Sequence, residues 1–281
     1  MNLQKRLVQR HFSRAAANYE ALATLQDQVG QEMLARLPLL KIDPQYLLDL
    51  GAGTGLQSRR LNRYFPRTRV IALDLALPML QEARRRKSWR QRQWFLQGDA
   101  EALPVQGSAL QMIFSNLLLQ WLPDPLPALR EMRRVLQPEG LLLCSSLGPD
   151  SLRELRRAFA EVDGEAHVHE FLDMHLLGDA MVQAGFADPV LDVEHYELQY
   201  DDLDALLRDL RGIGAASAHG RRGLFTPRKL QRLRAAYEAF RTPTGKLPLH
   251  YEVVHAHAWA APLRTDGELQ PLHFLPRKSR S

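Results

Sequence analysis

The chain has 281 residues, of which 45% are hydrophobic and 25% charged, as in globular proteins with a hydrophobic core. It contains no apolar run long enough to cross a bilayer and no signal-peptide core near Met1, so we expect neither membrane insertion nor export. The single cysteine, Cys144, excludes an intrachain disulfide and favours a reducing, cytoplasmic location. The net charge of +5 points to acidic partners, although solvated arginines alone would also explain it.

The first half of the chain predicts an α/β fold. Apolar residues at helical spacing predict two helices within residues 3–36, and a linker between Pro38 and Pro44 follows. Short apolar runs then occupy residues 46–50, 69–74, 93–97, 110–115 and 140–145, with amphipathic stretches at 56–65, 77–87 and 124–136. Continuous apolar strands that alternate with such helices predict a parallel sheet covered on both faces.

The second half predicts a sixth strand, a helical insertion and a seventh strand. Residues 149–184 are helical in pattern, 190–200 alternate like a strand, 202–240 are again helical, and 251–259 form the last strand. The polar tail is expected to be disordered. The predicted organisation is a helical lid (1–44), core strands one to six (45–201), an insertion on the substrate side (202–247), the final core strand (248–263) and the tail (264–281).

A glycine loop, Gly51-Ala-Gly53-Thr-Gly55, follows the first strand directly and precedes a helix. Glycines at this position allow a tight turn and let a ligand lie against the backbone. The dinucleotide-binding pattern is Gly-x-Gly-x-x-Gly, whereas the third glycine here comes one residue early. The loop therefore predicts a nucleotide-like ligand but argues against a dehydrogenase.

Two carboxylates follow the next two strands. Asp74 closes the second strand, where it could accept both hydroxyls of a ribose, or cap the helix that follows. Asp99, in Gly98-Asp99-Ala100, could accept from an exocyclic amine such as that of adenine, or serve only as a turn residue. Because the carboxyl ends of parallel strands meet at one edge of the sheet, the two together favour a nucleoside ligand.

The glycine loop, the segments around Asp74 and Asp99, and residues 133–140 together resemble class I methyltransferases. The resemblance covers about residues 45–147 and implies a Rossmann-like seven-stranded, mostly parallel sheet whose last strand runs antiparallel between strands five and six. It also implies that S-adenosylmethionine is the methyl donor. The implied donor-binding residues are Asp49, Gly51, Gly53 and Gly55 at the methionine end, Asp74 at the ribose, Leu75 and Met79 beside the adenine, and Asp99 with Ala100 at the adenine edge, together with Asn116.

The segment after the fourth strand, Ser115–Trp121, bears on the methyl acceptor. It lacks the Asn/Asp-Pro-Pro-aromatic tetrad of nucleic-acid and protein amide N-methylases, which argues against DNA adenine methylation. A nitrogen or hydroxyl acceptor usually needs a general base, whereas a carboxylate, with a pKa of about 4, is already ionised at neutral pH. An apolar pocket with few bases therefore suits a carboxylate.

Five further segments resemble the malonyl-acyl-carrier-protein O-methyltransferases of biotin synthesis: residues 11–19, 114–121, 167–171, 209–215 and 246–254. They extend the match from residue 5 to about 259, although the glycine- and arginine-rich segment 215–226 departs from it. The resemblance implies methylation of the free malonyl carboxylate, which yields the ester that primes pimeloyl formation. It also implies an acidic acyl-carrier protein as partner, and neither nucleic acid nor a membrane.

Each residue that could bind the methyl acceptor could instead have a purely structural role. Tyr19 could orient the carboxylate or pack against the core, and Trp121 could line the acyl channel or serve only in packing. A basic surface would steer an acidic carrier, but any one of its arginines could be merely solvated. The candidate docking residues are Arg153, Arg156, Arg208, Arg211, Arg221 and Arg222.

Paired histidines raise the question of a metal site. His167 and His169 share the spacing of His255 and His257, yet neither pair has the neighbouring cysteine or carboxylate set that would complete a site, so we predict no metal. Two other functions remain open: a methyltransferase acting on another small carboxylic acid or a quinone, and a binding protein that holds nucleic acid on its basic surface. The intact glycine loop, Asp74 and Asp99 argue against the second.

Overall fold

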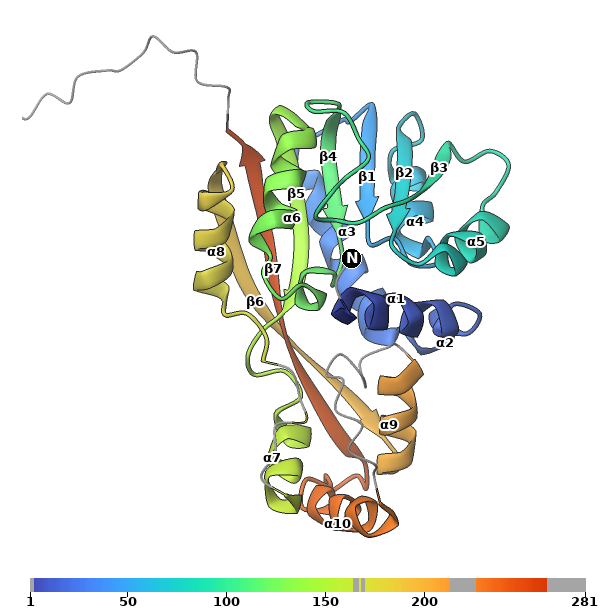
Figure 1. Cartoon of the computed structure of the whole chain (residues 1–281), viewed down its shortest axis with the longest axis vertical. Coiled ribbons are helices and arrows are strands. Elements are labelled where there is room, and N and C mark those ends of the chain that lie inside the picture. The colour runs from blue at the N-terminus through green and yellow to red at the C-terminus, as the bar shows by residue number, and fades with distance from the viewer. Residues whose placement is uncertain (1–2, 164–166, 168–169, 213–225, 262–281) are drawn as a thin grey trace, which may run out of the picture.

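A seven-stranded sheet with helices on both faces forms the centre of the computed structural model, which describes residues 3–163, 167, 170–212 and 226–261 (Figure 1). The strand order is β3-β2-β1-β4-β5-β7-β6. The strands are β1 (Tyr46–Leu50), β2 (Arg69–Asp74), β3 (Gln93–Gln97), β4 (Leu110–Ser115), β5 (Leu136–Leu147), β6 (Phe186–Tyr200) and β7 (Leu247–Ala260).

The pairing of β7 confirms the predicted fold class. Strands β1 to β5 pair in parallel, whereas β7 pairs antiparallel with β5 on one side and with β6 on the other. The last strand therefore lies between the fifth and the sixth, as the resemblance implied. The sheet is Rossmann-like and mostly parallel.

Helices α4 (Leu56–Tyr64), α5 (Leu77–Arg86) and α6 (Leu126–Val135) connect the parallel strands, and the short helix η1 (Leu119–Trp121) follows β4. Successive residues of a strand point to opposite faces, which explains the continuous apolar runs. Leu47 lies in the hydrophobic cluster on one face and Leu48 in the cluster on the other, and both are fully buried. Each such leucine contributes about 1.5–3 kcal/mol to the free energy of folding.

The N-terminal region contains three helices where the sequence predicted two: α1 (Leu3–Ala15), α2 (Tyr19–Leu22) and α3 (Thr24–Leu40). Pro38, expected in a linker, lies in the last turn of α3. A proline so close to the end of a helix removes few of its backbone hydrogen bonds. Buried residues such as Met33 and Leu37 also hold α3 against the core. Helices α1 and α2 lie across the carboxyl-end edge of the sheet (Figure 1), where Gln9 Nε2 donates to the Leu75 carbonyl at 2.9 Å.

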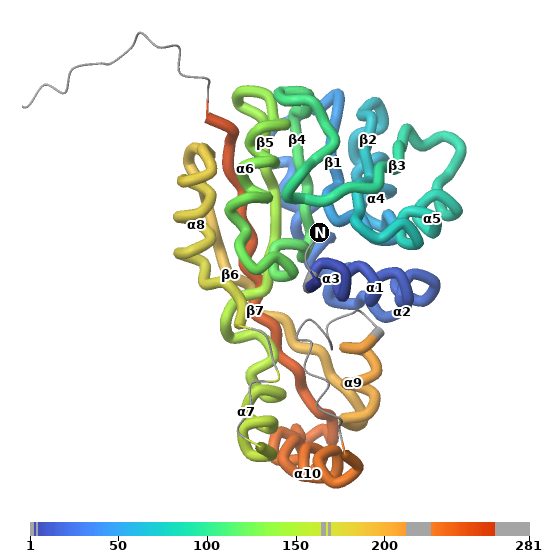
Figure 2. Tube along the Cα trace, in the orientation of Figure 1, coloured from blue at the N-terminus to red at the C-terminus, as the bar shows by residue number. Residues whose placement is uncertain are grey.

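Strands β6 and β7 continue past the rest of the sheet as a two-stranded arm (Figure 2). Helices α7 (Arg153–Val162), α9 (Leu203–Gly212) and α10 (Pro227–Glu238) surround this arm, and α8 (Met174–Gln183) packs on β6 near the sheet. The predicted insertion between strands six and seven therefore contributes α9 and α10. Buried Leu206, Leu233 and Tyr251 join the arm to the main core cluster.

The predicted tail, 264–281, lies outside the described residues. Within the described part of the chain, no helix is both long and apolar enough to cross a membrane.

Candidate active site

The glycine loop turns the chain sharply between β1 and α4. Gly51, Gly53 and Gly55 have φ angles of 77°, 54° and 75°, which favour glycine. A Cβ atom on Gly51 would lie 2.5 Å from Leu118 Cδ1, and one on Gly55 would lie 2.8 Å from Ala83 Cβ. Gly55 therefore serves close packing of the loop on α5, whereas Gly51 and Gly53 line an open pocket.

Asp74 is tied to this loop. Its Oδ2 accepts the Gly53 N–H at 2.9 Å, and its Oδ1 accepts the Ala76 N–H at 2.8 Å. Burial raises the pKa of Asp74, although the backbone hydrogen bonds oppose that shift. The carboxylate thus fixes the turn before α5 and lines the pocket. It does not cap the helix, because the N-cap of α5 is Ala76 and has no side-chain cap bond; ribose binding stays a prediction.

Asp99 forms an ion pair that the sequence analysis missed. Lys5 Nζ lies 2.6 Å from Asp99 Oδ2 and 2.5 Å from Glu101 Oε2. Burial alone would lower the pKa of Lys5, but its hydrogen bonds and charge interactions with the two carboxylates raise it overall. Lys5 and Asp99 are 94 residues apart, so no local pattern could have paired them.

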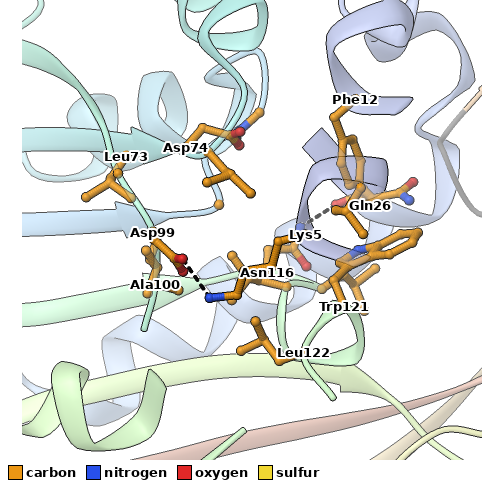
Figure 3. Close-up of a pocket in the computed structure, with 18 of the residues that line it drawn as sticks. Lys5, Phe12, Gln26, Leu73, Asp74, Asp99, Ala100, Asn116, Trp121 and Leu122 are labelled. Atoms are coloured by element: carbon orange, nitrogen blue, oxygen red, sulfur yellow. Dashed lines mark hydrogen bonds and ion pairs between the residues drawn. The ribbon is translucent and has the colours of Figure 1, made fainter. Parts of the chain in front are cut away.

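These groups surround one pocket at the carboxyl ends of β1, β2 and β4 (Figure 3). The space between its walls amounts to about 860 Å³, including the part that opens to solvent. Of the predicted residues, Tyr19, Gly51, Gly53, Asp74, Leu75, Asp99, Ala100, Asn116 and Trp121 line it. Helices α1 and α3 add further lining residues that sequence reasoning did not select, namely Lys5, Val8, Phe12 and Gln26.

Aromatic rings close the side of the pocket opposite Asp74 and Asp99 (Figure 3). The Phe12 ring stands edge-on to Trp121, with ring centroids 5.1 Å apart, and to Tyr19 at 6.2 Å. Burial, followed by the nearby charge of Asp74, raises the pKa of the Tyr19 phenol.

Asn116, at the end of β4, bridges the sheet and α3. Its Nδ2 donates to the Gln26 carbonyl at 2.8 Å, while its Oδ1 accepts the Ser145 hydroxyl at 3.0 Å. These two bonds place α3 against the strand ends that form the pocket.

Three predicted donor-binding residues do not line the pocket. Asp49 is 2% exposed and accepts a hydrogen bond from the Ser58 hydroxyl, and burial raises its pKa to about 7. Met79 is fully buried and packs in a small cluster with Ala16. Together with Gly55, these residues lie behind the pocket wall in this structure.

Four of the six predicted docking arginines are described, and they lie on α7 and α9 beside the arm, apart from the pocket. Arg153 donates to Glu154 at 2.9 Å, and Arg211 donates to the Leu207 carbonyl at 2.9 Å. Arg156 donates to two carbonyls of the segment before α7, at 2.9 and 3.1 Å, whereas Arg208 is exposed. Arg221 and Arg222 lie outside the described residues.

The structure describes three of the four paired histidines, namely His167, His255 and His257. His167 contacts Asp163, and His255 Nε2 lies 3.2 Å from Glu194 Oε2, while His169 lies outside the described residues. Among the residues that the structure describes, no group of three or more histidine, cysteine and carboxylate side chains could hold a metal ion.

Comparison with known proteins identifies the class. The methyltransferase-domain model matches residues 48–144. The crystal structure of YcgJ from Bacillus subtilis shares the fold, with a TM-score of 0.59 and 15% identity over 82% of this chain and 98% of that one. The chain is thus an S-adenosylmethionine-dependent methyltransferase with a Rossmann-like fold.

Proteins that match this chain over nearly its whole length identify its family. The chain is 44% identical to malonyl-[acyl-carrier protein] O-methyltransferase from Halorhodospira halophila, covering 99% of this chain and 98% of that protein. It is 47% identical to the protein of the same name from Xylella fastidiosa, covering 98% and 96%. The chain belongs to the malonyl-[acyl-carrier protein] O-methyltransferase family, which confirms the resemblance.

Proposed function

We propose that this enzyme transfers the methyl group of S-adenosylmethionine to the free carboxylate of malonyl-acyl-carrier protein. The observation that carries the proposal is the match to relatives of that name over 98–99% of the chain, which includes α1 to α3 and the arm as well as the common core. The product, a malonyl methyl ester, would prime pimeloyl formation in biotin synthesis in the cytoplasm.

Donor binding would use the residues at the strand ends. Bound S-adenosylmethionine supplies an electrophilic methyl group on its sulfonium. Asp74 would accept the ribose hydroxyls, Asp99 with Ala100 would meet the adenine edge, and Leu75 would flank the base. Gly51, Gly53 and Asn116 would hold the methionine end, while Asp49, Gly55 and Met79 would support these contacts from behind the pocket wall.

A carboxylate acceptor agrees with the protonation states at the pocket. Lys5 is held protonated by two carboxylates, and the raised pKa of Tyr19 keeps its phenol protonated. Neither group is therefore available as a general base. A carboxylate needs none, since it is ionised at neutral pH. Phe12, Trp121 and the neighbouring leucines would exclude water from the reacting groups.

Binding of the carrier protein would use the arm. An acidic carrier would be steered by exposed cations on α7 and α9, with Arg153, Arg208 and Arg211 as candidates and Arg156 shaping the segment before α7. Arg221 and Arg222 stay in the proposal on sequence grounds alone. The proposal requires neither nucleic acid nor a membrane.

A methyl-transfer assay read by mass spectrometry tests the proposal. Malonyl-carrier protein, malonyl-coenzyme A and free malonate are compared as acceptors. We expect a gain of one methyl group on the malonyl-carrier protein, removed by esterase treatment. Protein that binds the donor yet leaves malonyl-carrier protein unmethylated would refute the substrate assignment.

A further inference from the structure

Gln26 lines the pocket from the first turn of α3, on the side of Phe12 and Trp121 (Figure 3). Its backbone is fixed, because its carbonyl accepts from Asn116 Nδ2 at 2.8 Å and from Gln57 Nε2 at 3.4 Å. Its side-chain Oε1 is buried and has no hydrogen-bond partner in the structure. A buried amide oxygen without a partner costs free energy, so such an amide at a pocket wall points to a polar ligand group.

The position of this amide narrows the choice of ligand group. Asp74 and Asp99, which would bind the ribose and the adenine, lie across the pocket from Gln26 (Figure 3). The side next to Gln26 is formed largely by apolar and aromatic residues, so the acceptor would enter there if the donor occupies the side of Asp74 and Asp99. In the orientation shown, the buried atom is the amide oxygen, which a carboxylate cannot satisfy because it has no hydrogen to donate. A half-turn about the last side-chain bond places the amide N–H₂ at that buried position, where it can donate to a carboxylate.

We propose that the Gln26 amide donates the hydrogen bond that binds the acceptor carboxylate, beside Trp121. This inference rests on the proposed function and names a residue that sets the specificity for a carboxylate. A neutral amide suits the task, because it binds the anion without taking up or releasing a proton. It orients the carboxylate oxygen without acting as a base.

Tyr19 is less suited to this role by its place. Its ring lies over the glycine loop, where Cε1 is 3.6 Å from the position of a Cβ on Gly53. Burial and the nearby charge of Asp74 raise the pKa of the Tyr19 phenol. An acceptor carboxylate beside Asp74 would be repelled by it, whereas Gln26 binds from the opposite side. Tyr19 is therefore better placed to cover the donor.

The decisive variant is Gln26→Glu, which keeps the shape of the side chain and replaces both N–H donors by a carboxylate. For malonyl-carrier protein at pH 8 we expect kcat/KM to fall by about 30-fold or more, mostly through KM, since hydrogen bonds to charged groups are worth about that much. As pH falls toward 5.5, protonation of the introduced carboxylate restores a donor, so the ratio of variant to wild-type kcat/KM should rise. The affinity for S-adenosylhomocysteine, measured by calorimetry, should change less than about twofold.

Gln28→Glu is the matched control, because Gln28 is exposed on the same helix and the charge change is identical. It should leave kcat/KM within about twofold of wild type. If Gln26→Glu does not fold, as judged by its thermal transition, Gln26→Met takes its place and should show the loss without recovery at low pH.

Two results would overturn the inference. Unchanged kcat/KM in the Gln26 variant would show that the amide does not contact the acceptor. A parallel weakening of S-adenosylhomocysteine binding would instead assign Gln26 to the methionine end of the donor. The wild-type reaction distinguishes a wrong role for Gln26 from a wrong proposed function. If wild-type enzyme methylates malonyl-carrier protein, either result overturns only the role of Gln26. If wild-type enzyme does not, the proposed function is refuted and this inference with it.

Discussion

Asp74 holds two backbone segments together and also lines the pocket. Its two oxygens accept from Gly53 and Ala76, so the carboxylate ties the glycine loop to the start of α5. Its position after β2 was predictable because the end of a parallel strand places a side chain at the ligand edge of the sheet. The same oxygens would have to serve the ribose when donor binds.

Asp74→Ala is expected to weaken S-adenosylhomocysteine binding at least about 10-fold, because two ribose hydroxyls lose a charged acceptor. Titration calorimetry measures the change. Asp74→Asn, which keeps the shape, should weaken binding less, and exposed Asp43→Ala should have no effect. Wild-type affinity in Asp74→Ala would refute the assigned ribose site.

Asp49 makes stability depend on pH. Its pKa rises from 3.8 to about 7 in the folded protein, so the folded state binds the proton more tightly than the unfolded state. The resulting stabilisation is complete below about pH 4 and disappears as pH rises to about 7. Asp49→Asn should escape this loss, and its stability relative to wild type should rise by up to about 4 kcal/mol between pH 4 and pH 8.

Urea unfolding of the ligand-free protein at a series of pH values measures this difference. Exposed Asp43→Asn provides the control and should follow the wild-type curve. A difference between Asp49→Asn and wild type that stays constant with pH would mean that Asp49 titrates near its ordinary pKa in the folded state.

At the scale of elements, α1 is held over the pocket by Lys5. Its ammonium group pairs with Asp99 and Glu101 on the loop after β3, and its side chain is only 11% exposed. The sequence predicted a helix here, since the 3.6-residue period is local. It could not predict which strand end the helix would contact, because that depends on how the helix packs.

Lys5→Met should loosen α1, because two partly buried carboxylates lose their shared cation. We expect a loss of about 1–3 kcal/mol in the local stability of residues 3–15, measured as faster amide hydrogen exchange in peptides from that segment. Arg6→Met is the control, since Arg6 is exposed. Equal exchange in wild type and Lys5→Met would show that the ion pair does not hold the helix.

At the scale of the whole molecule, the donor pocket and the basic arm are separate regions joined by β6 and β7 (Figure 2). The arm forms because the two antiparallel strands pair along nearly their whole length, from Phe186–Ala260 to Tyr200–Leu247. Its helices pack on residues that belong to the main core cluster, so the arm and the sheet share one hydrophobic core. The proposed sites for the donor and for the carrier therefore lie on different elements.

Reversing two exposed charges on the arm, Arg208→Glu with Arg211→Glu, should raise KM for malonyl-carrier protein several-fold. KM for malonyl-coenzyme A and the affinity for S-adenosylhomocysteine should stay within about twofold. Added salt should likewise weaken the wild-type use of carrier protein more than donor binding, since long-range charge attraction is screened. Equal effects on both thioesters would refute docking through the arm.

The sequence by itself determined the parallel strands, the glycine loop, the two carboxylates at the strand ends and the class of enzyme. The strands, the loop and the carboxylates follow from local backbone geometry and from the alternation of side chains along a strand, which act over a few residues. The class of enzyme came from the resemblance of these motifs to class I methyltransferases. The tertiary structure alone decided that Lys5 meets Asp99, that Gln26 faces the pocket and that Asp49 and Met79 lie behind its wall. Such contacts join residues far apart in the chain and exist only once α1 and α3 pack across the ends of β1, β2 and β4.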